Sequence, residues 1–519
     1  MFIENIKNEL NQETQFTENG GIGYATSGEK FVDFNFKITS YRDMSDVDII
    51  ADFIELYNAD PVLSFKMLFF ARDIRGGLGE RRLFKVILRM MAIENPLWIK
   101  TVLPLIPEYG RWDDIFVLFD TPVEKDMVKL VGEQLNEDIK HYIEGASLSL
   151  LAKWMPSINT SSKSTRELAR QFLTYFDMTE RQYRQTLAKL RSALNIVEKN
   201  LTEQKYSLIH YAKVPSQAHM RYRNVFLNKD TERYEAYLEA LKKGDTTIKA
   251  STLAPYEIWH KYNYKAGSLG AWWAENTTSE YDETLEQLWK NLPDTGNLTN
   301  TLVVADGSGS MTTTLGKTEI MALDVAQSLA VYFGERCEGQ FQNTFITFSS
   351  NPQLVQFGNG SLQSKMRVVG KYTEVANTNI EKVFQLILST AIANNMKQSE
   401  LPEQILIISD MEFDSATRDY RLYYTNRESS RPSKSLMDRL AAKFIAEGYK
   451  MPKLIFWNTC SRSLTIPIQK NELGAILISG FNTAAIQAAM TGLDDPFEAI
   501  KQVLNDSRYE AIEKALSKI

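Results

Sequence analysis

The sequence has little cysteine and histidine and no long hydrophobic run. Only two cysteines occur in 519 residues, Cys337 and Cys460, which excludes a disulfide framework and predicts two buried thiols. The four histidines show no metal-ligand spacing, which argues against a zinc site. No stretch approaches the roughly 18–20 apolar residues of a membrane span, and the acidic start lacks the pattern of a signal peptide. We therefore expect a cytoplasmic protein that does not enter a membrane.

Patterns of known catalytic sites are also missing. Gly307-Ser308-Gly309 lacks the flanking residues of a nucleophile elbow, and no order of Ser, His and Asp points to a hydrolase. The composition, with 44% hydrophobic and 24% charged residues, is ordinary for a globular protein, and the length allows two to four domains. These observations favour a protein that binds partners over an enzyme.

The net charge of −6 conceals an uneven distribution. Residues 1–60 contain 4 Lys and Arg against 12 Asp and Glu, whereas residues 151–224 contain 13 against 5. A locally basic region is typical of proteins with an anionic partner, although solvated helix faces also carry Lys and Arg. Both interpretations stay open for the middle of the chain.

The first half has the periodicity of helices. Apolar residues recur at helical spacing in Val47–Tyr57, Leu63–Ala71, Arg82–Ile93, Pro122–Ile143, Ser164–Tyr175, Glu180–Leu201, Thr231–Lys243 and Thr284–Asn291. Helix pairs of roughly 40–47 residues would fit a HEAT-like repeat array. The alternating segment Phe31–Ile38 precedes the array and could form an arm strand. The turn formers of Pro293–Asn297 mark the expected boundary between the helical array and the second half of the chain.

The second half alternates short apolar runs with helical stretches. The expected strands are Thr301–Ala305, Thr344–Phe348, Leu354–Phe357, Ile405–Ser409, Leu454–Trp457 and Ala475–Ser479. This alternation predicts a doubly wound parallel sheet, in which ligands bind at the carboxyl ends of the strands. We thus divide the chain into an arm (1–40), a helical-repeat domain (41–293) and a Rossmann-like α/β domain (294–519).

Carboxylates and hydroxyls come after two of these strands. Asp306, Ser308 and Ser310 come directly after the first strand, and Asp410 comes after the fourth. Thr378 lies in the polar loop between them. Because Mg²⁺ prefers oxygen ligands in near-octahedral geometry, these five residues are candidate ligands of Mg²⁺ or another divalent cation such as Mn²⁺. A serine-glycine turn without a metal is the alternative.

Two segments carry candidate phosphate-binding arginines. The first is the glycine-rich Gly76–Gly79, which lacks the ending of a nucleotide loop and favours a turn between helices, flanked by Arg75, Arg81 and Arg82. The second segment interleaves arginine and tyrosine, a combination that can neutralise phosphates and stack on unpaired bases. Its candidates are Arg418, Arg421 and Arg427. An ordinary solvated loop is the alternative, and we expect Trp112 and Trp154 to be packing residues.

The order Asp-x-Ser-x-Ser, then Thr, then Asp resembles the metal-ion-dependent adhesion site (MIDAS) of von Willebrand factor A domains, which often have Gly-Thr-Asp where this chain has Asn377-Thr378-Asn379. Other strings resemble motifs of a family known as domain of unknown function 2828. These are Phe70–Arg82, Pro107–Asp114, Lys153–Ser157, Tyr183–Arg191 and Ser409–Phe413. The string Tyr183–Arg191 adds Arg184 and Arg191 to the candidate binding residues.

The plan of a helical part before an A domain is similar to that of the Ro/TROVE proteins, whose helical ring binds noncoding RNA. That resemblance implies a non-enzymatic, RNA- or ribonucleoprotein-binding scaffold, with a Mg²⁺-dependent site that accepts an acidic residue of a protein partner. The alternative is a protein adaptor without nucleic acid, similar to A-domain partners of MoxR-type ATPases. A metal-dependent nuclease is a third hypothesis, for which the sequence supplies neither a positioned base nor a second metal site.

Overall fold

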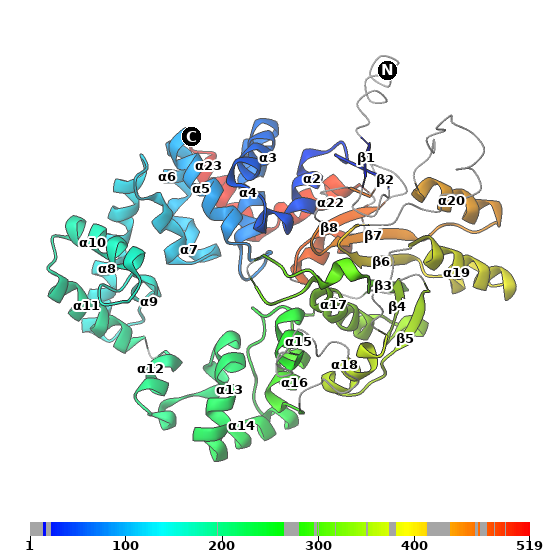
Figure 1. The fold of residues 1–519 in the computed structure, drawn as a ribbon. Coiled ribbons are helices and arrows are strands. Elements are labelled where there is room, and N and C mark those ends of the chain that lie inside the picture. The colour runs from blue at the N-terminus through cyan, green and yellow to red at the C-terminus, as the bar shows by residue number, and fades with distance from the viewer. Residues whose placement is uncertain are drawn as a thin grey trace. The chain divides into compact units, whose positions relative to one another are not determined.

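The computed structural model describes residues 14–16, 22–194, 196–263, 280–294, 298, 300–316, 318–348, 351–372, 380–412, 436–461, 466–467, 475–481, 483–491, 493 and 495–519. The chain folds into two compact units (Figure 1). The sheet unit comprises residues 1–45 and 253–505, and the helical unit comprises residues 46–252 and 506–519. No helix among the described residues is long and apolar enough to cross a bilayer.

The sheet unit contains a six-stranded sheet in the order β5-β4-β3-β6-β7-β8. All neighbouring pairs are parallel except β4 and β5, which form an antiparallel pair at one edge. The strands are β3 (Thr301–Asp306), β4 (Thr344–Phe348), β5 (Gln353–Gln356), β6 (Gln404–Ser409), β7 (Lys453–Asn458) and β8 (Ile476–Ser479). All six lie within two residues of the positions predicted from the sequence.

Helices cover the sheet, and four of its strands are therefore buried along nearly all of their length. Every residue of β3 and β8 is buried, as is every residue of β6 and β7 after the first, as expected when both faces are covered. Helix α17 packs on β3, β4 and β6. The α-helices among the described residues of this unit are α2 (Lys30–Lys37), α15 (Pro255–Asn263), α16 (Glu283–Lys290), α17 (Ala322–Arg336), α18 (Leu362–Gly370), α19 (Ile380–Ala393), α20 (Leu436–Ala446), α21 (Gln487–Met490) and α22 (Pro496–Leu504).

The N-terminal segment belongs to the sheet unit. Residues Lys30–Lys37 form helix α2, which packs on β8 and α22, so the expectation of an arm strand at Phe31–Ile38 was wrong. The segment's apolar residues satisfy both a two-residue and a helical period, and the helix buries four of them, Phe31, Val32, Phe34 and Phe36. Two short strands, β1 (Thr14–Phe16) and β2 (Ile22–Tyr24), pair with each other ahead of it.

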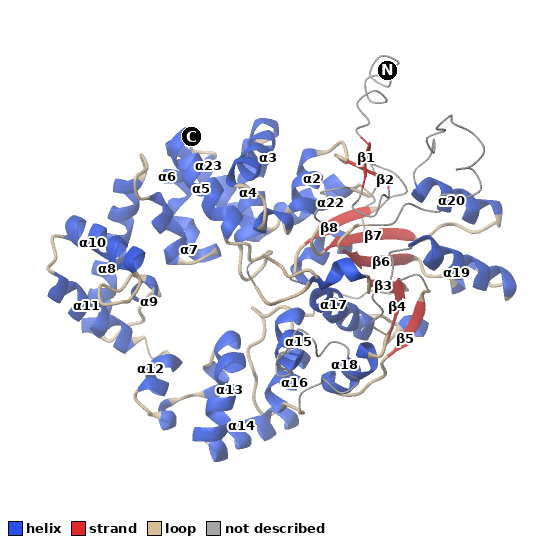
Figure 2. Cartoon of the chain, viewed as in Figure 1, coloured by secondary structure: helices blue, strands red, loops and turns tan. Residues whose placement is uncertain are grey.

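The helical unit has no strand among its described residues (Figure 2). Its α-helices are α3 (Asp46–Ala59), α4 (Pro61–Arg72), α5 (Arg82–Glu94), α6 (Pro96–Val102), α7 (Ile106–Tyr109), α8 (Glu124–Glu144), α9 (Leu151–Trp154), α10 (Lys163–Phe176), α11 (Glu180–Ala193), α12 (Val197–Thr202), α13 (Ser216–Lys229), α14 (Thr231–Lys243) and α23 (Glu510–Leu516). A 3₁₀ helix, η3 (Trp112–Leu118), packs on α5 and α7. A helical first half is thus found, while the HEAT-like repeat class stays a prediction.

The two units are interleaved along the chain. Helix α16, which the sequence placed at the end of the helical array, belongs to the sheet unit. So does α15, a helix that the sequence did not predict, which packs on α17. The last helix, α23, belongs to the helical unit and packs on α4 and α6. The compact units therefore divide the chain at residues 45, 252 and 505, rather than at the sequence-based boundaries after residues 40 and 293.

Candidate functional site

Two acidic residues meet at the carboxyl ends of neighbouring parallel strands. Strand β3 ends with Asp306, and Asp410 comes directly after the last residue of β6. The register pairs Ala305 with Ile408, which brings the two strand ends together. Beyond β3 the sheet continues to β4, and beyond β6 it continues to β7. The two carboxylates thus lie at the topological switch point, where doubly wound sheets bind their ligands.

Hydrogen bonds fix the Asp306 carboxylate. One oxygen accepts the backbone N–H of Ser308 at 2.9 Å, and the other accepts the hydroxyl of Ser409 at 2.6 Å. The hydroxyl oxygens of Ser308 and Ser310 lie 2.9 Å apart. On the adjacent strand, Asp410 accepts the backbone N–H of Glu412 at 3.2 Å. The site therefore collects two carboxylates and two serine hydroxyls, which are all hard oxygen donors.

The electrostatics of this site are unfavourable without a balancing positive charge. Asp306 and Asp410 are both buried, each with about 1% of its surface exposed. Burial, and then the negative charge of Asp410, raise the pKa of Asp306 to about 7. Two ionised carboxylates so close together cost free energy in a low-dielectric environment, and either a proton or a cation relieves that cost.

Four of the five predicted metal ligands are brought together by the structure. These are Asp306, Ser308, Ser310 and Asp410. The fifth, Thr378, lies outside the described residues, so its place in the site stays a prediction. Among the residues that the structure describes, no group of three or more His, Cys, Asp or Glu side chains is placed to hold a metal. A site of two carboxylates and several hydroxyls does not require such a group.

The same edge of the sheet gathers further buried polar residues that sequence reasoning missed. The Asn458 side chain at the end of β7 donates to the carbonyl of Phe36 at 2.8 Å and accepts the N–H of Ser461 at 2.8 Å. At the end of β8, the hydroxyls of Ser479 and Thr39 lie 3.0 Å apart. Their place in the sequence could have revealed them, because Asn458 and Ser479 are the last residues of buried strands, as Asp306 is.

In the helical unit, the glycine-rich segment is a turn between α4 and α5. The backbone N–H groups of Leu78 and Glu80 donate to carbonyls of α4, at 3.1 and 2.7 Å, and that of Gly79 donates to Asp73 at 3.1 Å. A Cβ atom at Gly77 would lie 2.0 Å from the carbonyl oxygen of Phe70. These N–H groups are therefore used inside the protein, which supports the predicted turn and not a phosphate loop.

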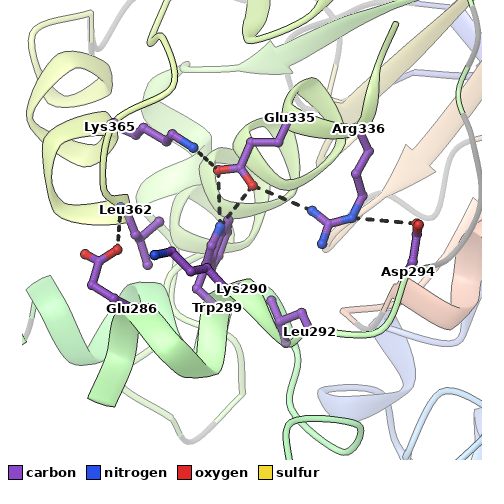
Figure 3. Close-up of a pocket in the computed structure, with 10 residues that line it drawn as sticks. Glu286, Trp289, Lys290, Leu292, Asp294, Glu335, Arg336, Leu362 and Lys365 are labelled. Atoms are coloured by element: carbon purple, nitrogen blue, oxygen red, sulfur yellow. Dashed lines mark hydrogen bonds and ion pairs between the residues drawn. The ribbon is translucent and has the colours of Figure 1, made fainter. Parts of the chain in front are cut away.

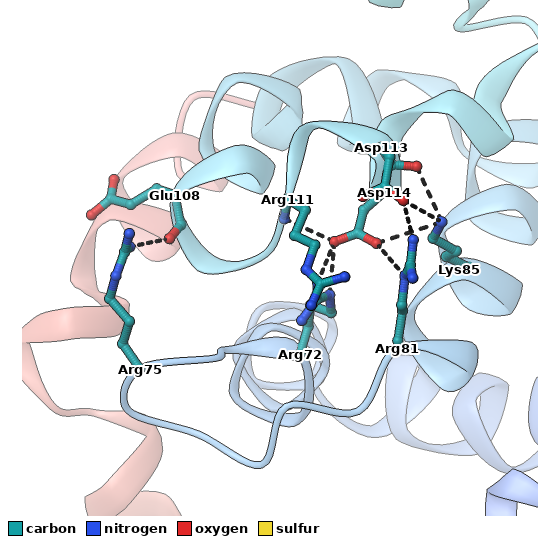
Figure 4. A network of polar contacts seen from close by, with 8 residues as sticks. All are labelled: Arg72, Arg75, Arg81, Lys85, Glu108, Arg111, Asp113 and Asp114. Carbon is teal, nitrogen blue, oxygen red and sulfur yellow. Dashed lines mark hydrogen bonds and ion pairs between the residues drawn. The ribbon is translucent and has the colours of Figure 1, made fainter. Parts of the chain in front are cut away.

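The arginines around this turn face acceptors of the protein itself (Figure 4). Arg75 is exposed and donates to the carbonyl of Glu108 at 2.7 Å. Arg81 forms an ion pair with Asp113 and contacts Asp114 at 3.4 Å. Outside the view of Figure 4, Arg82 forms an ion pair with the exposed Asp46. These three predicted binding residues are thus near the surface but already hold internal partners.

The two candidates on α11 differ from each other. Arg191 is half-buried and donates to the carbonyls of Ala152 and Met155, at 2.7 Å each, and to the hydroxyl of Ser157 at 2.9 Å. It therefore fastens α11 to the segment after α9. Arg184 is exposed and has no ion pair among the described residues. The remaining candidates, Arg418, Arg421 and Arg427, lie outside the described residues.

The sheet unit also contains a cavity of about 420 Å³ (Figure 3). Glu335 is its central acid, and it accepts Lys365 at 2.6 Å and the indole N–H of Trp289 at 3.1 Å. Glu286 caps the start of α18 by accepting the N–H groups of Leu362 and Gln363, at 2.8 and 3.1 Å. The acids of this cavity thus serve the fold, and they are matched in number by its cations, Lys290, Arg336 and Lys365.

Both cysteines are buried and neither belongs to a disulfide, as predicted. Burial raises the pKa of Cys337 to about 12, which keeps it in the thiol form.

Comparisons with known proteins match two parts of the chain to two families. Residues 300–518 match the family described as Domain of unknown function (DUF7788), and residues 160–298 match Domain of unknown function (DUF2828). The second match bears out the resemblance to that family, and one of the predicted strings, Tyr183–Arg191, lies within it. Neither description names a von Willebrand factor A domain, so that assignment stays a prediction.

Two individual proteins are similar over most of the chain. "Uncharacterized protein L728" of Acanthamoeba polyphaga mimivirus is 28% identical over 534 residues, which cover 94% of this chain and 87% of that protein. Among solved structures, the RO (RSR) protein of Deinococcus radiodurans covers 91% of this chain and 93% of its own, with 13% identity and a TM-score of 0.34. A likeness this weak supports no functional argument.

Proposed function

We propose that this protein is a non-enzymatic scaffold that holds a divalent cation, Mg²⁺ or Mn²⁺, in its sheet unit and uses it to bind an acidic group of a protein partner. One observation carries the proposal. Asp306 and Asp410 are buried side by side at the switch point of the sheet, where the charge of one raises the pKa of the other. A bound cation would remove that repulsion.

The donor set fits a hard cation. Asp306 and Asp410 would offer carboxylate oxygens, while Ser308 and Ser310 would offer hydroxyls. Thr378, the predicted fifth ligand, would add one more hydroxyl. Such an ion, when bound, supplies an open coordination position for an outside oxygen atom, in the manner of the adhesion sites that the motif resembles. The surrounding hydrogen bonds from Ser409 and the Ser308 N–H hold the Asp306 carboxylate in place.

Calorimetric titration with Mg²⁺ and Mn²⁺ tests the metal site. Asp306→Asn keeps the shape of the side chain but removes its charge, so we expect at least about a tenfold loss of affinity, equivalent to 1.4 kcal/mol. Glu498→Gln is the matched control, because Glu498 is an exposed acid of the same unit that pairs with Lys501 at 2.8 Å. Equal affinities of the wild type and Asp306→Asn would refute the site, as would the absence of any binding at millimolar concentration.

The helical unit supports the second part of the proposal, which is RNA binding. The exposed side of α11 carries Arg181, Arg184 and Lys189, and none of them has an ion pair among the described residues. The only acid of this helix, Glu180, lies 3.7 Å from Arg170. A helix face with free cations is suited to the phosphates of RNA.

Binding of labelled structured RNA tests this part. We expect affinity to fall by at least about tenfold between roughly 50 and 200 mM salt, because phosphate contacts release counterions. Replacing Arg181 and Arg184 by Gln should weaken binding and reduce the salt dependence, whereas Lys243→Gln on α14 should do neither. Affinity that is indifferent to salt would favour the alternative, an adaptor without nucleic acid. Such an adaptor would co-purify with a protein partner, such as an ATPase of the MoxR type, and not with RNA.

A further inference from the structure

One part of the helical unit holds more positive than negative charge in a half-buried position. Arg72, Arg81, Lys85 and Arg111 surround two carboxylates, those of Asp113 and Asp114 (Figure 4). Four cations against two anions leave a formal charge of +2. We call these six residues the cationic cluster. They come from α4, α5, η3 and the residues just ahead of the latter two elements.

Three of the cations contact the two carboxylates, although one oxygen of Asp113 is buried without a hydrogen-bond partner among the described residues. Arg72 donates to Asp114 at 2.8 Å and is buried with it. Arg81 contacts both acids, and the Lys85 ammonium lies 3.8 Å from Asp113 and 3.6 Å from Asp114. Lys85 also donates to the backbone carbonyl of Asp113 at 3.1 Å. Three cations thus already face two anions before Arg111 is counted.

Arg111 is the fourth cation. Its guanidinium donates to no acceptor among the residues that the structure describes, and it lies 4.6 Å from the centre of the Trp154 ring. Lys153 approaches the same ring at 5.8 Å. Burial, and then the charges of Arg81 and Arg72, lower the pKa of Arg111, and burial with the charge of Arg81 lowers that of Lys85. The repulsion among these cations is thus not balanced within the protein.

We propose that Arg111, Lys85 and Arg81 form a binding site for a terminal phosphate group, with Trp154 holding the Arg111 guanidinium in position. A phosphate monoester carries close to two negative charges near neutral pH, which matches the excess of +2. A guanidinium offers paired N–H donors that fit phosphate oxygens, and its stacking on an indole limits the orientations it can take. A carboxylate would neutralise only half of the excess charge.

This inference rests on the proposed RNA role only for the source of the phosphate, which is either the 5′ end of an RNA or a free mononucleotide. Trp154 was expected to be a packing residue, and its half-exposed ring is compatible with that role as well. What the site adds is a preference for a chain end over the internal diesters, because each internal phosphate carries a single charge.

The test compares ligands that differ only in the terminal phosphate. Affinities are measured by calorimetry for inorganic phosphate, 5′-AMP, adenosine, and a single-stranded RNA of ten nucleotides with and without a 5′-phosphate. For the full-length protein we expect the phosphorylated form of at least one pair to bind about tenfold more tightly or better. Arg111→Gln and Lys85→Gln should each abolish that difference, Arg111→Lys should restore part of it, and Arg184→Gln on α11 should leave it unchanged.

The outcomes separate this site from the wider RNA proposal. A phosphate preference for 5′-AMP that needs Arg111, without any RNA binding, would support the site and refute the RNA role. RNA binding that depends on Arg181 and Arg184 but ignores the 5′-phosphate would refute the site and leave the RNA role standing. Equal phosphate preference in the wild type, Arg111→Gln and Lys85→Gln would also overturn the site. If Arg111→Gln does not fold, judged by circular dichroism, Lys85→Gln decides.

Discussion

The buried ion pair between Arg72 and Asp114 gives the sharpest prediction for stability. Both side chains are almost fully buried, at 2% and 0% exposure. Asp114 accepts Arg72 Nε at 2.8 Å and the backbone N–H of Arg111 at 2.9 Å. Asp114→Asn keeps the shape but removes the charge, leaving the buried guanidinium without its counter-ion.

The size of the effect depends on that burial. Removing one partner of a buried ion pair costs about 3–5 kcal/mol, because the remaining charge stays out of water without compensation. Here Arg81 and Lys85 also lie close to Asp114, at 3.4 and 3.6 Å, so the loss of the carboxylate increases the repulsion among the cations. We therefore expect Asp114→Asn to lower the unfolding free energy of the helical unit by about 3–5 kcal/mol.

Hydrogen exchange is the suitable assay, because a chain of two units need not unfold in one step. The exchange protection of amides in α4, α5 and η3 reports on the region around the pair. The matched control is Glu133→Gln, which removes one charge from an exposed ion pair. The side chains of Lys129 and Glu133 are 74% and 63% exposed, and their charged atoms lie 3.8 Å apart. Such surface pairs contribute about 0–1 kcal/mol, so the control should change little.

A double variant makes the reasoning refutable. Arg72→Met together with Asp114→Asn removes both charges and leaves a polar amide beside an apolar side chain. We expect it to recover at least about half of the stability lost in Asp114→Asn, since replacing a buried pair by an apolar group is often nearly neutral. A single variant that loses less than about 1 kcal/mol, or a double variant no more stable than the single one, would show that the pair does not act as a buried charge couple.

Three further changes test the fold. Burial lowers the pKa of His219 to about 4, so protonation favours the unfolded chain, and the helical unit should lose about 2 kcal/mol between pH 7.5 and pH 5, measured by urea unfolding of that unit. His219→Gln should remove that pH dependence, and an unchanged slope would exclude His219 as its source. Gly77→Ala should cost more than about 3 kcal/mol of stability, because its Cβ would lie 2.0 Å from a carbonyl oxygen. Gly79→Ala, at a position with φ of +74° and open space around the Cβ, should cost about 1–2 kcal/mol. Equal losses of melting temperature in the two variants would contradict this reasoning. Deleting residues 506–519 should lower the melting temperature of the helical unit by several degrees, because Arg508 pairs with the buried Asp73. An unaltered melting transition would disprove the role of that contact.

The sheet was predictable because its signals are local. Each buried strand is a short run of β-branched or aromatic residues, and the carboxyl ends of parallel strands meet at one edge. That Asp306 and Asp410 both lie at this edge could therefore be inferred from their positions at the ends of two predicted strands. The same reasoning could have included Asn458 and Ser479, which end β7 and β8.

The missed features depend on long-range packing. Helix α13 escaped prediction because its buried side includes His219 and Arg223, polar residues that weaken the apolar period. Arg191 looked like a surface cation, yet it meets three acceptors near α9 whose position no local pattern encodes. Arg111, whose guanidinium donates to no acceptor in the described part of the chain, was likewise hidden, because the excess charge arises only where α4, α5 and η3 converge.

Contacts from the N-terminal segment occupy one part of the sheet's carboxyl edge and leave the candidate metal site at another part. Helix α2 and the residues after it bond to the carboxyl ends of β7 and β8. Asn458 donates to the carbonyl of Phe36, Ser40 donates to that of Ser461 at 2.8 Å, and the hydroxyls of Thr39 and Ser479 lie 3.0 Å apart. Those strand ends are thus occupied by the chain itself, whereas the ends of β3 and β6 carry the two repelling acids. A fragment starting at residue 294 would lose α2, and with it the partners of β7 and β8. It would also lose α15, which packs on α17, the helix that lies against β3 and β6. We therefore expect a fragment of residues 294–519 to be less stable than the sheet unit, because α2 and α15 contribute contacts to that unit from outside the fragment.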